Sequence, residues 1–144
     1  ADRLFRLGQH ELALERVNAY IASRPRDARG HFLKGRILAA QNRREEAIRV
    51  FTELTQNFPE LPEPYNNLAV LYAAQGQYDR ARSLLEAAIA AHPGYAVAHE
   101  NLGDIYARMA GQAYRKALQF DRGSASAGAK LEALDSVLTP GGRP

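Results

Sequence analysis

Residues 64–93, PYNNLAVLYAAQGQYDRARSLLEAAIAAHP, decide the fold because they contain two helical patterns separated by a glycine. Four apolar side chains of the first half have the i, i+3, i+4, i+7 spacing of one helix face: Tyr65, Leu68, Ala69 and Tyr72. Gly76 interrupts this pattern, and a second apolar face follows it. The second pattern ends at Pro93, because a proline cannot continue the hydrogen-bond ladder of a helix. The stretch therefore predicts a pair of helices joined by a short turn.

The same pattern recurs at a period of 34 residues, and residues 30–59 align with residues 64–93 at this step. Several columns of equivalent residues keep the step: His31, Tyr65 and His99; Gly35, Ala69 and Gly103; Leu38, Tyr72 and Tyr106; Ala13, Ala47 and Ala81; Pro25, Pro59 and Pro93. Because neither helix of a pair buries its apolar stripe alone, neighbouring pairs must stack. The sequence therefore predicts an all-α array of tandem helix-turn-helix units.

These columns closely resemble the tetratricopeptide repeat (TPR), whose pattern is an aromatic residue, Leu-Gly, Tyr, Ala, Phe, Ala and a terminal Pro. The matching residues are Tyr65, Leu68, Ala69, Tyr72, Ala81, Leu85, Ala88 and Pro93. The preceding unit departs mildly, with His31 at the opening aromatic position and Lys34 where Leu is usual. The resemblance covers about residues 1–123 and implies a right-handed superhelix of helix hairpins.

We expect one domain over residues 1–138. Its expected parts are a partial repeat at 1–27, full repeats at 28–61 and 62–95, a shortened repeat at 96–123, a capping helix at 124–138 and a disordered tail at 139–144. Ser124 is the expected N-cap of the capping helix, and Pro140 and Gly141 are its expected end. Three leucines are expected to form its inner face: Leu131, Leu134 and Leu138.

The shortened repeat lacks about five residues where the other units have their turn. What remains keeps one helical phase, with apolar or small residues three or four apart: His99, Leu102, Tyr106, Met109, Ala113, Ala117 and Phe120. Gly111 is the only breaker, and one glycine costs about 1 kcal/mol relative to alanine. We therefore hypothesise one continuous helix near 97–121, with a cramped hairpin at Ala110–Gly111 as the alternative.

The second half of such a helix cannot fold back onto its own first half. Three of its side chains would then need another partner: Tyr114, Leu118 and Phe120. The helix at 124–138 is one candidate, and a second copy of the chain in a domain-swapped homodimer is the other.

The residue content gives little sign of catalytic or metal chemistry. The chain has no cysteine, which excludes disulfides and thiol catalysis, and its basic residues are scattered among acidic ones without the basic stripe of a nucleic-acid-binding protein. No apolar run approaches the 18 or so residues of a membrane span. The four histidines have no metal-ligand spacing, and no phosphate-binding loop or nucleophile elbow occurs. We therefore expect no enzyme activity, no cofactor, no metal, no nucleic acid and no membrane insertion.

In the TPR family the first helix of each repeat lines a concave groove, and peptides lie across it. The resemblance assigns this role to nine residues: Arg29, Phe32, Arg36, Asn66, Asn67, Val70, Glu100, Asn101 and Asp104. Asn67 and Asn101 are one period apart, and their amides would either hold a peptide backbone or join neighbouring repeats.

Charge is uneven along this groove. Cations gather near Arg36 and acidic residues near Asp104, which suits a peptide with an acidic end toward Arg36 and a basic end toward Asp104. Some TPR proteins clamp the C-terminal carboxylate of a chaperone with Lys and Arg. Asn66 and Glu100 stand where such a cation would help, which argues against that ligand.

The expected function is a non-catalytic scaffold that binds a protein or peptide segment in this groove. Two alternatives remain, namely a self-assembly module that forms a homo-oligomer and an adaptor domain of a larger enzyme or secretion machine. The segments PEPYNNLAVLYA (62–73) and HENLGDIYA (99–107) are similar to those of short exported bacterial TPR proteins. This resemblance implies a bacterial source and a periplasmic location, with a cytoplasmic location as the alternative.

Overall fold

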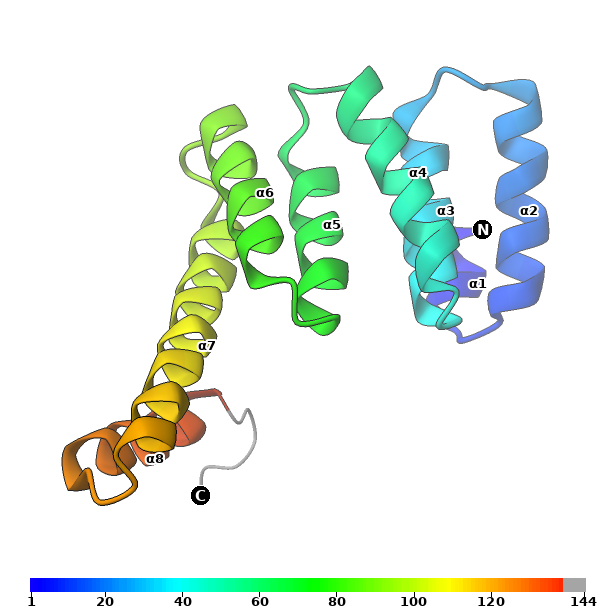
Figure 1. Ribbon diagram of the computed structural model, residues 1–144. Coiled ribbons are helices and arrows are strands. Elements are labelled where there is room, and N and C mark those ends of the chain that lie inside the picture. Colours follow the sequence, from blue (N-terminus) through cyan, green and yellow to red (C-terminus); the bar gives the residue numbers. More distant parts are fainter. Residues whose placement is uncertain (139–144) are drawn as a thin grey trace.

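The computed structural model describes residues 1–138, which form eight α-helices and no strand (Figure 1). The helices are α1 (Asp2–Arg6), α2 (His10–Ser23), α3 (Ala28–Ala40), α4 (Arg44–Asn57), α5 (Pro62–Ala74), α6 (Tyr78–Ala91), α7 (Ala96–Phe120) and α8 (Ala125–Leu138). The predicted all-α array of helix hairpins is therefore confirmed. The predicted tail at 139–144, with Pro140 and Gly141, lies outside the described residues.

The helices from α2 to α6 stand side by side in chain order, and each packs mainly on its neighbours in the sequence (Figure 1). The paired helices touch at the predicted column of small residues, because Ala13, Ala47 and Ala81 are each 0% exposed. Alanine leaves room for the facing helix, so the apolar side chains on either side of it reach the core. The repeated alanine column is thus the line along which the paired helices meet.

The turns inside the hairpins share a backbone conformation that follows the same period of 34 residues. Gly8, Asn42 and Gly76 have φ values of +77°, +60° and +77°, and each lies between the two helices of its hairpin. Glycine adopts this left-handed conformation without steric cost, and asparagine tolerates it better than most residues do. The left-handed residue lets the chain reverse after the first helix of each hairpin.

The long helix expected near 97–121 is present as α7, which runs for 25 residues from Ala96 to Phe120. It contains no turn at Ala110–Gly111, so the alternative hairpin is not formed. At about 1.5 Å per residue, α7 is about 38 Å long. Its first half packs on α6, and its second half projects beyond the array of α2 to α6 (Figure 1).

The last helix, α8, packs against this projecting half of α7. Ser124 is its N-cap as predicted, because the Ala127 amide donates a 3.2 Å hydrogen bond to the Ser124 hydroxyl oxygen. The ammonium of Lys130 lies 5.9 Å from the centre of the Tyr114 ring. Phe120 is 84% exposed, so α8 supplies a partner for only part of the apolar surface on this half of α7.

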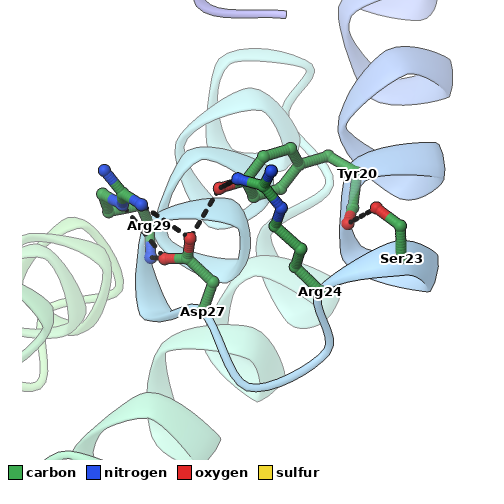
Figure 2. Close-up of polar contacts among 5 residues, drawn as sticks. All are labelled: Tyr20, Ser23, Arg24, Asp27 and Arg29. Atoms are coloured by element: carbon green, nitrogen blue, oxygen red, sulfur yellow. Dashed lines mark hydrogen bonds and ion pairs between the residues drawn. The ribbon is translucent and has the colours of Figure 1, made fainter.

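The junction between α2 and α3 is held by the carboxylate of Asp27 (Figure 2). The Tyr20 hydroxyl donates to it at 2.5 Å, and the backbone amide of Arg29 donates to it at 3.0 Å as an N-cap contact. The Arg29 guanidinium also pairs with it at 2.9 Å. The hydrogen bonds from the Arg29 and Tyr20 side chains hold the pKa of Asp27 well below its usual range.

Replacement by alanine should change the stability of the protein in opposite directions at two glycines of the same repeat column. A Cβ at Gly35 would lie 2.6 Å from Cζ of the buried Phe51, whereas a Cβ at Gly103 would meet nothing within 4 Å. Overpacking a core costs about 1–3 kcal/mol, while replacing a helical glycine by alanine gains about 1 kcal/mol. We expect thermal unfolding at low protein concentration to show Gly35→Ala less stable and Gly103→Ala more stable than wild type. Equal shifts in the two variants would contradict the different packing of this column.

Asp27→Asn should destabilise the protein in a manner that depends on pH. Asparagine still caps a helix, so the change removes mainly the charge paired with Arg29. Because folding lowers the pKa of Asp27, its charge contributes stability above the usual aspartate pKa, and this contribution is lost as the pH falls through the folded-state value. We expect a lower urea midpoint than wild type at pH 7 and a shrinking difference below about pH 4.

The matched control for Asp27→Asn is Asp79→Asn, which removes an exposed carboxylate paired with Arg82 at 3.5 Å. Exposed pairs of this kind contribute little, and an acidic residue in the first turn of a helix adds only about 0.3–1 kcal/mol, so the control should lose less stability at pH 7 than Asp27→Asn. If Asp27→Asn lowers the urea midpoint by the same amount at acid and neutral pH, the loss of charge is not the cause.

Candidate functional site

The surface assigned to binding by the sequence is formed by α3, α5 and the first half of α7. It contains two hollows that share no residue. The first lies between α3 and α5, and the second lies between α5 and α7. The predicted residues divide between them: Arg29, Phe32 and Arg36 line the first hollow, and Val70, Asn101 and Asp104 line the second.

The first hollow has a volume of about 510 Å³ and an apolar floor. The floor consists of Ala28, Phe32, Leu33, Leu54, Leu61 and Pro64. Phe32 is held in place by an edge-to-face contact with Phe51, with ring centroids 5.8 Å apart. The rim is charged and carries both signs, from Asp2, Arg29, Arg36 and Glu63. The hollow therefore offers an apolar site bordered by ionic groups.

The second hollow, of about 400 Å³, has an apolar wall and a polar wall. The α5–α6 hairpin supplies the apolar wall, with Ala69, Val70, Ala73, Ala74, Tyr78 and Leu85. The α7 helix supplies Asn101, Asp104 and Arg108 along with Ile105. Arg108 stands beside Asp104, so this end of the surface carries both signs of charge rather than the purely acidic character that the sequence predicted.

A hydrogen bond between two asparagine side chains joins α5 to α7. The Asn101 amide donates to the Asn66 side-chain oxygen at 2.9 Å, and Asn66 is only 5% exposed. An inter-repeat bond from Asn67 is one of the two roles expected from the sequence, but the bond is made by Asn66, one residue earlier. Asn66, Asn67 and Glu100 line neither hollow, although all three lie on the helices that form the surface.

The two predicted arginines of the first hollow differ in their contacts. Arg29 is bound to Asp27, which raises the pKa of its guanidinium and occupies two of its nitrogens. Arg36 lies with its guanidinium carbon 5.0 Å from the centre of the Phe5 ring, a cation–π contact that leaves its edge open. Arg36 forms no ion pair with any residue in 1–138. It is therefore the rim arginine that has its charge free for a ligand.

The histidines of the repeat column serve the junctions between hairpins. The ring Nε2 of His31 lies 2.7 Å from the carbonyl oxygen of Pro25, and that of His99 lies 2.8 Å from that of Pro93. Each contact joins the first helix of a repeat to the loop that precedes it. These rings thus hold loops in place, in keeping with the predicted packing role.

Residues 1–138 contain no group of three or more metal-ligating side chains placed to hold an ion. None of the helices in the same range is both long and apolar enough to cross a bilayer.

Apart from Phe32, the apolar floor of the first hollow was not predicted from the sequence, and neither was Arg108 in the second hollow. Leu61 and Pro64 come from the loop before α5 and from its first turn, and Leu54 comes from the end of α4. A helix-face pattern within one repeat does not show which residues of the next repeat complete a hollow. The family rule that first helices line the groove would have found Arg108, which lies one turn after Asp104 on α7.

Comparison with solved structures places this architecture among TPR proteins. A thermophilic TPR protein of Thermus thermophilus superposes with a TM-score of 0.69 at 20% identity, over 94% of this chain and 78% of that one. YrrB, a TPR protein with an unusual peptide-binding site, gives a TM-score of 0.64 at 26% identity over 68% of this chain. This chain spans 50% of the length of YrrB.

A third similar structure is the first TPR of Spaghetti (RPAP3), bound to the HSP90 peptide SRMEEVD. It superposes with a TM-score of 0.55 at 22% identity, over 77% of this chain and 94% of that one. A comparison with curated protein sequences gives no significant match. Sequence profiles of the tetratricopeptide repeat match residues 1–62, 38–102 and 72–120. The chain therefore belongs to the tetratricopeptide repeat family.

Proposed function

We propose that the chain is a non-catalytic scaffold that holds an extended segment of a partner protein along the surface of α3, α5 and α7. The observation that carries this proposal is the first hollow, whose apolar floor is open to solvent and bordered by charges. Its volume of about 510 Å³ lies within the usual range for ligand sites. Membership of a family of interaction modules supports a binding role over a catalytic one.

The hollow suits a large apolar side chain of the bound segment. Full burial of a leucine or phenylalanine side chain contributes about 1.5–3 kcal/mol, which is enough to select for such an anchor. The floor is preorganised, because Phe32 packs on Phe51 and Pro64 is fully buried. Little conformational entropy would therefore be lost by the protein when the anchor enters.

The charges on the rim favour an acidic residue beside this anchor. Arg36 is exposed and has no ion pair among residues 1–138, whereas Arg29 is already bound to Asp27. A carboxylate of the segment would pair with the open edge of the Arg36 guanidinium. Toward α7 the segment would meet Asp104 and Arg108 together, and a basic residue near Asp104 remains our proposal for that end.

The similar structures support a peptide ligand as a class, since YrrB has a peptide-binding site and the RPAP3 domain holds an HSP90 peptide. The chaperone terminus itself is not our proposal for this chain. Asn66 is buried against Asn101 and Glu100 is acidic, so neither supplies the cation that a terminal carboxylate needs at those positions.

Binding should depend on the anchor and on the sign of the charge at Arg36. The probes are two short peptides with a central leucine, one flanked by glutamates and the other by lysines. Arg36→Glu should weaken the acidic peptide about fivefold, corresponding to about 1 kcal/mol, and should strengthen the basic peptide. Isothermal titration calorimetry at low salt measures both changes.

Two controls separate this site from general electrostatic attraction. Arg16→Glu makes the same charge change on α2, at an exposed residue that lines neither hollow, and should leave both affinities unchanged. Replacing the central leucine of the peptide by alanine should weaken binding by at least tenfold, because the anchor is lost. Equal effects of the Arg36 and Arg16 variants, or indifference to the leucine, would rule out this site.

A further inference from the structure

In the other repeats, two separate helices face each other in a hairpin. In α7 the residues equivalent to both facing surfaces lie on one continuous helix. In α3, the equivalent of its first half, Gly35 is covered by Phe51 so closely that an added Cβ would lie 2.6 Å from the ring. Gly103 occupies the same column in α7, and an added Cβ there would meet nothing within 4 Å. The first half of α7 is therefore shaped to receive a second helix that is not present on it.

The second half of α7 likewise lacks a helix packed on one of its faces. Its sequence aligns with α6 so that Ala110, Tyr114 and Ala117 match three residues of the α6 core: Ala81, Leu85 and Ala88. All three α6 residues are fully buried, whereas Ala117 is exposed and Ala110 and Tyr114 are half-buried. The contact with α8, through Gly111, Tyr114 and Lys130, covers one side of this half. Tyr114 stays half-buried beside this contact and Ala117 stays exposed, so part of the helix-pairing face remains uncovered.

Both faces lie along one line of α7. Six residues spaced three or four apart form a stripe that we call the α7 seam: His99, Gly103, Tyr106, Ala110, Tyr114 and Ala117. This is the spacing by which two helices pack along their whole length. The seam carries no Asp, Glu, Lys or Arg, and its members are exposed or half-buried in the part of the chain that is described. The opposite side of the first half faces α6, where Ala98 and Ile105 are buried.

We propose that two copies of the chain pair antiparallel through the α7 seam, so that Gly103 of each copy receives Tyr114 of the other. Tyr114 occupies the repeat column of Phe51, so this contact reproduces the one between Gly35 and Phe51 in the α3–α4 hairpin. In an antiparallel pair related by a two-fold axis, the contact of residue i with j is repeated as j with i. One pairing therefore fills the open space at both copies of Gly103.

The register of this pair supports the second copy as the occupant. Placing Gly103 opposite Tyr114 puts the two-fold axis between Arg108 and Met109, within one residue of the midpoint of Ala96–Phe120. The register that the repeat columns require is therefore also the one in which the two helices overlap completely. Each copy would contribute a strip about 38 Å long and about 10 Å wide, with α6 and α8 as side walls. The two strips together would bury roughly 760 Å², less than the about 1,200–2,000 Å² of a standard stable interface, so we expect a weak dimer that dissociates on dilution.

The pairing would restore the regular order of helices across two chains. The first half of α7 would be followed in space by the second half of the partner's α7 and then by the partner's α8. In this arrangement the helix array continues from one copy into the other, and each dimer carries two copies of the surface proposed to bind peptide. This assembly role is independent of the peptide proposal, since the seam shares no residue with either hollow.

Disulfide trapping tests the register directly, because the chain has no cysteine of its own. A protein with Gly103→Cys is mixed under mild oxidation with a protein carrying Tyr114→Cys. Each protein then has a single cysteine, so any disulfide must join two chains, and it forms readily only where the two Cα atoms come within about 7 Å. The matched control mixes Gly103→Cys with Gln112→Cys, which places the thiol on an exposed residue away from the seam.

We expect the Gly103–Tyr114 mixture to form a mixed disulfide at least tenfold faster than the control mixture. Insertion of the turn sequence AAQGQ, copied from residues 73–77, after Tyr106 should restore the hairpin within one chain and yield a monomer by light scattering. The proposal is overturned if the two mixtures react at the same rate. It is also overturned if wild type scatters as a monomer at high concentration, or if a folded insertion variant still dimerises.

Discussion

The close approach of paired helices at small residues is the constraint on which the rest of the structure depends. Ala13, Ala47 and Ala81 have no exposed surface, and Gly35 lies directly under the Phe51 ring. A larger side chain in these columns would separate the helices and expose the apolar stripes on both. Once the hairpins close at these points, their stacking follows, and stacking sets the first helices side by side to form the surface with two hollows.

Much of this arrangement could be predicted from the sequence because it depends on periodicity. The 34-residue step and the helical spacing within it predict the hairpins, and the unbroken phase from His99 to Phe120 predicts the single long helix. The left-handed backbone shared by Gly8, Asn42 and Gly76 was not predicted. Position 42 is asparagine, so the glycine does not recur in every repeat. The N-cap at Ser124 could also be predicted, because its hydroxyl bonds to an amide of the same helix.

The binding surface was less predictable, because it depends on the angle at which helices from different repeats meet. Neighbouring residues on a helix point about 100° apart, so a small rotation decides whether Asn66 or Asn67 bonds to Asn101. Likewise, Arg29 looked like a free cation in the sequence, but Asp27 holds it at the junction between α2 and α3. Two asparagines and two charged residues thus decide what the surface offers, and only the folded chain shows how they pair.

The contacts of α7 have a further consequence for how the chain unfolds. Nearly every helix contact joins neighbours in chain order, so the stability of each element is coupled to the next in a one-dimensional manner. Between the array and α8, this coupling passes through the backbone hydrogen bonds of α7 around Gly111, rather than through a packed hairpin. In a single copy, α8 and the end of α7 therefore form a unit that can open while α1 to α6 stay folded. We therefore expect the loss of one turn to divide a cooperative array into two parts that unfold in separate steps.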